Sequence, residues 1–170
     1  LETRIAILRK KVASQRLTAG SEVLELIASR IPTNIRELEG ALTRVAALAS
    51  LNQQEMTVAL AEEVLNDLMP QDAAPVDAQT IMDSSARYFG ITHDDLTGSS
   101  RVANIASARQ IAMYLCRELT DLSLPKIGAK FGGRDHSTVL HAVRKISEKI
   151  GVDRALYTQV TELTNQIKQS

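Results

Sequence analysis

Apolar residues recur every three or four positions along most of the chain, the spacing that places side chains on one face of an α-helix. In the first part of the chain this pattern predicts four short helices, over about residues 1–16, 23–31, 35–48 and 57–68. The second helix ends at Pro32. Asn34, followed three residues later by Glu37, makes a capping-box start for the third. Together the four helices predict a small bundle.

The helical period resumes further along the chain. It predicts a helix over residues 78–89 closed by Gly90, a single turn over 93–96, and a longer helix over 107–119. Ser123 caps a short helix that carries Pro125 in its first turn, where a missing N–H costs nothing. The pattern predicts that this helix stops at Gly132 and Gly133, that Asp135 caps a helix to residue 150, and that a last helix covers 152–168.

One stretch between these halves has the composition of a linker. Residues 69–77 combine Pro70 and Pro75 with small and polar residues. We therefore predict an all-α protein with a helical domain over residues 1–70, a linker over 71–77 and a second helical domain over 78–170.

Composition supports this class and narrows the chemistry. Only 3% of residues are aromatic and none is Trp, so aliphatic side chains must form the core. Cys116 is the single cysteine, which excludes an internal disulfide and predicts a small buried side chain. The chain has no apolar run long enough to span a bilayer and no signal segment, and it begins inside a helical pattern. We expect a cytoplasmic location and a fragment of a longer protein.

Charge is unevenly distributed although the net charge is zero. Residues 99–149 carry nine basic side chains against four acidic ones, a net charge of +5. A concentration of this kind is the usual electrostatic footprint of a protein that binds nucleic acid. The basic residues are Arg101, Arg109, Arg117, Lys126, Lys130, Arg134, Arg144, Lys145 and Lys149.

The segment SLPKIGAKF, the turn GG and the segment RDHSTVLHAVRKI predict two helices joined by a tight glycine turn, the helix-turn-helix arrangement. Such a motif contacts bases mainly through the first turn of its second helix. A carboxylate there accepts from cytosine, and a Thr methyl meets the methyl of thymine. An ordinary helix cap uses the same residue types and remains the alternative. The candidates for reading bases are Asp135, His136, Ser137 and Thr138.

The string GGRDHSTVLHAVRKI resembles the signature of the duplex-binding domain of the DnaA family of bacterial replication initiators. ASARQIAMYLCRELT and SLPKIGAKF are similar to the helices that precede it in that family. The resemblance implies sequence-specific binding of duplex DNA boxes at a replication origin, and places Arg101, in the loop GSSRVANIA, in the minor groove. The residues expected to hold phosphates are Arg109, Gln110, Arg117 and Lys145, joined by Lys126 and Arg134, which flank the same helices.

The string NIRELEGALTRV resembles the sensor-two helix in the lid of the same family's AAA+ module. The resemblance implies that Arg36 senses bound ATP or ADP with Mg in the full-length protein. An ion pair with Glu37 or Glu39 is the alternative. The sequence lacks the phosphate-binding motif G-x-x-x-x-G-K-[ST], so we expect no cofactor and no ATP hydrolysis by this chain. Expected partners are duplex DNA, further copies through the AAA+ module, acidic phospholipids and replication regulators.

Other chemistries find little support. His136 and His141 project about 140° apart on a helix, which argues against a shared metal. Cys116 lies among apolar neighbours, and no serine has the context of a nucleophile. A helix-turn-helix transcription regulator with a helical partner domain remains an alternative, and it would usually bind a two-fold site as a dimer. An ATPase is a third possibility that a turnover assay decides.

Overall fold

The computed structural model describes residues 1–31, 34–68 and 76–169. Within those ranges every regular element is a helix, apart from an isolated β-bridge between Ala19 and Met56, which confirms the predicted all-α class. Contacts divide the chain into unit 1, residues 1–72 with 149–158, and unit 2, residues 73–148 with 159–170. Most of the linker predicted over 71–77 lies outside the described residues, so the domain boundary stays a prediction.

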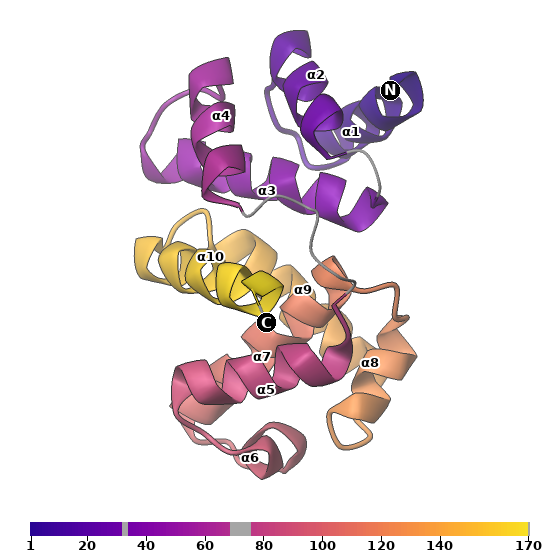
Figure 1. Ribbon diagram of the computed structural model, residues 1–170, viewed down its shortest axis with the longest axis vertical. Coiled ribbons are helices and arrows are strands. Elements are labelled where there is room, and N and C mark those ends of the chain that lie inside the picture. Colours follow the sequence, from indigo (N-terminus) through magenta and orange to yellow (C-terminus); the bar gives the residue numbers. More distant parts are fainter. Residues whose placement is uncertain (32–33, 69–75, 170) are drawn as a thin grey trace. The chain divides into compact units, whose positions relative to one another are not determined.

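Unit 1 contains the four helices expected in the first part of the chain (Figure 1): α1 (Glu2–Ser14), α2 (Ser21–Arg30), α3 (Ile35–Leu51) and α4 (Val58–Asp67). α1 and α4 each pack against both α2 and α3. Burial of the apolar faces supplies the main stabilisation, as expected for amphipathic helices. The fully buried side chains of this core include Leu8, Ile27, Leu38, Leu42, Val45 and Val64.

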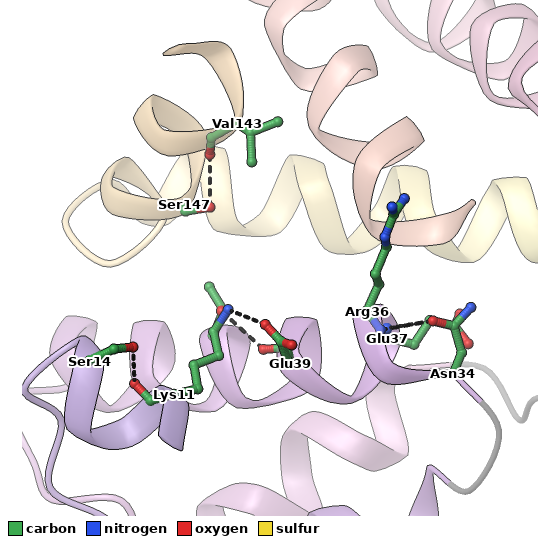
Figure 2. A network of polar contacts seen from close by, with 9 residues as sticks. Lys11, Ser14, Asn34, Arg36, Glu37, Glu39, Val143 and Ser147 are labelled. Atoms are coloured by element: carbon green, nitrogen blue, oxygen red, sulfur yellow. Dashed lines mark hydrogen bonds and ion pairs between the residues drawn. The ribbon is translucent and has the colours of Figure 1, made fainter. Parts of the chain in front are cut away.

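The start of α3 in unit 1 follows the predicted cap. The Asn34 side chain accepts hydrogen bonds from the backbone N–H of Arg36 at 2.9 Å and of Glu37 at 3.2 Å. Thr57 caps α4 in the same way. Lys11 joins α1 to α3 through an ion pair with Glu39 at 3.2 Å (Figure 2). Pro32, where the second helix was expected to end, lies outside the described residues, and α2 itself ends at Arg30.

Unit 2 is built from α5 (Ala78–Phe89), α6 (His93–Thr97), α7 (Ala103–Leu119), α8 (Leu124–Lys130) and α9 (His136–Lys149), with the later part of α10 (Arg154–Gln169). α5 packs along α7, and α6 contacts both (Figure 1). The buried side chains are mostly aliphatic, as the low aromatic content predicts. They include Ile81, Leu96, Ile111, Leu115, Ile127, Phe131, Val139, Ile146 and Leu163.

Most helix ends in unit 2 also lie where the caps predicted them. Asp77 accepts from the Thr80 N–H at 2.8 Å, and this bond lowers the pKa of the Asp77 carboxyl below its ordinary value. Gly90 closes α5 in the left-handed conformation. The expected start of the longer helix at residue 107 is wrong, because α7 begins at Ala103. Val102 provides no side-chain cap, so the sequence carries no signal for this start.

Candidate DNA interface

α8 and α9 form a helix-turn-helix whose turn is closed by backbone contact. The N–H groups of Gly133 and Arg134 both donate to the Gly128 carbonyl, at 3.1 and 2.9 Å. A Cβ on Gly128 would stand 2.0 Å from the Arg134 carbonyl oxygen, so the turn fits only against a residue without a side chain. Gly132 and Gly133 take positive φ angles, 82° and 79°, which the reversal requires. The predicted tight turn between α8 and α9 is thus held by backbone hydrogen bonds to Gly128 and by the positive φ angles of Gly132 and Gly133.

The first turn of α9 presents its polar residues to solvent. Asp135, His136, Ser137 and Thr138 are all exposed, whereas Val139 on the same helix is fully buried. His136 Nδ1 lies 3.0 Å from one Asp135 carboxylate oxygen, and the Ser137 hydroxyl donates to the other at 3.2 Å. Asp135 therefore holds two of the predicted base-reading side chains in a defined arrangement.

Arg101 is exposed in the segment that connects α6 to α7. This connection covers residues 98–102. It is shorter than the sequence predicted, because α7 begins four residues earlier than expected. Ser100 accepts from the Val102 N–H at 3.3 Å, which bends the chain next to Arg101. The expected minor-groove arginine therefore stands on a short connection and not on a long loop.

Arg109 is 7% exposed, and its guanidinium faces the protein. Nε donates to the Leu96 carbonyl at 3.0 Å, and the two terminal nitrogens donate to Ser100 at 3.0 Å and Asp95 at 2.6 Å. Burial, and next the nearby charge of Arg134, lower the pKa of Arg109. Little of this side chain is available to a phosphate, the role that the sequence predicted for it.

Arg134 has a similar environment although it comes from the turn before α9. Its terminal nitrogens donate to the carbonyls of Thr97, at 3.4 Å, and of Gly98 and Phe131. Burial lowers the pKa of its guanidinium. The sequence placed Arg134 among the phosphate contacts because of its charge, but it contained no sign of these carbonyl partners.

The other predicted phosphate-binding residues lie on three helices of unit 2. Gln110 and Arg117 are half-buried on α7, and Arg117 donates to the Leu122 carbonyl at 3.3 Å. Lys126 is exposed on α8 and Lys145 is exposed on α9. Lys130, at the end of α8, is also exposed and adds a cation that the sequence reading left without a role.

Arg36 lies in the first turn of α3 in unit 1 and is half-buried. Figure 2 shows its side chain extending away from the α3 axis, while its backbone N–H is held by Asn34. The start of this helix is where the resemblance places a nucleotide-sensing arginine. That role stays a prediction.

Several features bear on other chemistries. Cys116 is fully buried, and burial raises the pKa of its thiol to about 12, as expected of a packing residue. Within the described ranges, no group of three or more His, Cys, Asp or Glu side chains gathers as metal ligands would. In the same ranges none of the helices has the length and apolar character needed to cross a membrane.

Comparison with known proteins identifies the family. A family model described as the bacterial DnaA protein helix-turn-helix matches residues 78–146. The chain is 62% identical over 170 residues to the chromosomal replication initiator protein DnaA of Cutibacterium acnes. This chain belongs to the DnaA family. It is also 57% identical over 171 residues to the DnaA protein of Leifsonia xyli subsp. xyli.

The chain corresponds to the C-terminal region of DnaA, including its helix-turn-helix domain. The two alignments cover 99% and 100% of this chain, but only 34% and 36% of the relatives, so it spans about a third of their length. A crystal structure of a DNA replication initiation factor is 26% identical, with a TM-score of 0.48, over 99% of this chain and 47% of that one.

Proposed function

We propose that unit 2 binds a short specific site on duplex DNA, with the first turn of α9 in the major groove and Arg101 in the adjacent minor groove. The observation that carries this proposal is the exposed row of polar side chains from Asp135 to Thr138 at the start of a rigidly turned second helix. Donors and acceptors at that position meet base edges when the helix enters the groove.

Within this row the proposed roles follow from chemistry. Asp135 accepts from cytosine, Thr138 contacts a thymine methyl, and the exposed imidazole of His136 contacts a base edge. Ser137, which donates to Asp135, orients that carboxylate or contacts a base itself. An isolated helix cap would need only one such side chain, and all four are exposed.

Phosphate contacts supply most of the affinity and set the register on the duplex. We assign them to four side chains on α7, α8 and α9 that lie outside the reading turn, residues 135–138 at the start of α9: Gln110, Arg117, Lys126 and Lys145. Each cation that displaces a condensed counterion steepens the dependence of affinity on salt.

The setting proposed for this binding is the bacterial replication origin, in the cytoplasm, within a longer initiator that ATP regulates. The relatives are chromosomal replication initiators, which supports this setting. Nucleotide binding with Mg, and self-assembly, are proposed for the full-length protein through a region outside this chain. We propose no enzymatic activity for the chain alone.

Selection of binding sites from a randomised duplex pool tests the proposal. We expect one short motif to be enriched, bound by one chain per copy, with base protection in a major groove and the neighbouring minor groove. Enrichment of a two-fold repeat bound by a dimer would instead indicate a transcription regulator. Retention of the pool without enrichment of any motif would overturn sequence-specific binding.

A further inference from the structure

Five of the six consecutive backbone carbonyls from Asp95 to Ser100 accept hydrogen bonds from just two side chains, Arg109 and Arg134. This segment, which we call the carbonyl loop (residues 95–100), leads directly into Arg101. Its residues 95–97 form the end of α6 and residues 98–100 follow that helix, and carbonyls at a helix end or in irregular backbone ordinarily bond to water. In this protein the carbonyls of the carbonyl loop instead accept hydrogen bonds from two guanidinium groups.

The two arginines hold different parts of the carbonyl loop. Arg109, on α7, takes the carbonyls at both ends, those of Asp95, Leu96 and Ser100. Arg134 takes the middle ones, those of Thr97 and Gly98. A planar guanidinium with several N–H donors suits this task, whereas a lysine ammonium is a compact point charge on a flexible stem.

Arg134 also belongs to the helix-turn-helix. Its backbone N–H donates to the Gly128 carbonyl on α8, and Asp135, the next residue, begins the reading turn. One residue therefore joins three parts: α8 through its backbone, the carbonyl loop through its side chain, and α9 through the chain itself. A displacement of the loop relative to α9 would break these bonds.

A second contact fixes the same junction. A Cβ on Gly132 would stand 2.0 Å from the Thr97 carbonyl oxygen, so the backbone of the turn lies directly against the carbonyl loop. The loop thus rests on the helix-turn-helix by close backbone approach as well as by hydrogen bonds.

We propose that Arg134 and Arg109 are positioning residues that lock the carbonyl loop onto the helix-turn-helix and so fix Arg101 at one distance from the reading turn of α9. This proposal rests on the proposed function. It replaces the phosphate-binding role expected of Arg109 from the family resemblance and of Arg134 from its charge. Arg101 is then held in position before DNA binds, so binding costs less conformational entropy than it would if the loop were mobile.

The test compares a charge-conserving change at each position. Arg134→Lys and Arg109→Lys keep the positive charge that a phosphate needs, but remove the donors that hold the carbonyls. Arg87→Lys, an exposed arginine at the end of α5, is the matched control. The probes are two duplexes: the selected one, and a variant with G·C in place of A·T at the base pair that Arg101 contacts. That pair is identified as the position where Arg101→Ala no longer discriminates between A·T and G·C.

We expect the wild type and Arg87→Lys to prefer the A·T duplex about tenfold. Arg134→Lys and Arg109→Lys should reduce this preference to about twofold or less, and adding Arg101→Ala to either should reduce it no further. Base discrimination by α9 should persist in both variants. The proposal would be overturned if Arg134→Lys and Arg109→Lys kept the preference for the A·T duplex. It would also be overturned if Arg134→Lys and Arg101→Ala, combined in one protein, lowered that preference by the product of their separate effects.

A measurement on the wild type covers the case in which a variant does not fold. NMR of the arginine side chains should show those of Arg109 and Arg134 ordered in the free protein and little changed by the duplex, whereas Arg101 becomes ordered on binding. Signals of Arg109 and Arg134 that are mobile until DNA is added would overturn the proposal. If no duplex binds, the proposed function fails, while the free-state signals still report whether the two side chains are held.

Discussion

The carbonyl oxygen of Arg134 lies so close to Gly128 that a Cβ on that glycine would stand 2.0 Å from it. Alanine normally stabilises a helix relative to glycine by about 1 kcal/mol. At Gly128 the sign should reverse, because either the backbone at Arg134 or α8 must move, as in an overpacked core. We expect Gly128→Ala to lower the free energy of unfolding of unit 2 by about 2 kcal/mol, measured by urea denaturation.

Gly20→Ala is the comparison for this change, since a Cβ there would meet no atom within 4 Å. Gly20 lies in unit 1, and we expect the substitution to alter the free energy of unfolding of that unit by less than about 1 kcal/mol. Equal effects of the two substitutions would show that the close approach at Gly128 is relieved at no cost.

Substitutions in the reading turn and in the later part of α9 should have different effects on DNA binding. His136→Ala and Thr138→Ala should each remove about 1 to 3 kcal/mol of discrimination between the selected duplex and a scrambled one. Lys145→Ala should weaken both complexes about equally and reduce the slope of log affinity against log salt by about 1, because it removes one phosphate contact. Titrations of both duplexes at several salt concentrations check this division. Loss of overall affinity alone in all three variants would contradict it.

Arg101 should read the minor groove through the absence of the guanine amino group. That group obstructs an inserted guanidinium, and A·T pairs lack it and also form a narrower, more negative groove. Inosine·cytosine has the minor groove of A·T and the major groove of G·C. We therefore expect I·C at the contacted pair to preserve most of the affinity and G·C to lose it, with Arg101→Ala binding all three duplexes alike. Were Arg101 to contact only a phosphate, the wild type would not distinguish the three.

Cys116 should make stability depend on pH above the ordinary thiol pKa of 9.0. Burial raises the pKa of the folded thiol to about 12, so between these values the unfolded chain loses a proton that the folded chain keeps. The stabilisation is complete below pH 9 and is lost as the pH rises towards 12. From pH 8 to pH 10 we expect this thiol to lower the free energy of unfolding by about 1 kcal/mol.

Cys116→Ala is the control, because it lacks the titrating thiol and retains the other groups, including Tyr88, whose pKa is raised to about 12 chiefly by burial. Urea denaturation of both proteins at the two pH values isolates the thiol. Parallel pH dependences would show that Cys116 ionises as easily in the folded protein as in the unfolded one.

The isolated chain should bind ATP weakly or not at all, since it contains Arg36 but no phosphate-binding loop motif. Calorimetric titration with Mg-ATP measures this directly. In a longer protein that includes the ATPase core, Arg36→Ala should weaken the response of DNA binding to ATP, with Arg30→Ala, an exposed position in the same unit, as the control. Tight binding of ATP by the isolated chain would contradict the assignment.

Local signals determined the helices of this protein. α5 ends before Gly90 and α3 begins after Asn34, as predicted, because a cap acts on backbone groups within one turn of itself. The start of α7 escaped prediction because Val102 has no capping side chain. The exposed reading turn from Asp135 to Thr138 was likewise predictable, since the opposite face of α9 carries the apolar period.

The sequence by itself thus determined the helical class, the glycine turn and the candidates for reading bases. Only the tertiary structure decided which groups Arg109 and Arg134 contact. Both are cations in a basic segment, and the family resemblance for Arg109 and the local charge for Arg134 placed them among the expected phosphate contacts. Their observed partners are the backbone carbonyls of Phe131 and of residues within 95–100, and every residue carries a carbonyl, so no side-chain pattern could have marked these. The folding of that loop around two guanidinium groups is a long-range event, which local sequence does not encode.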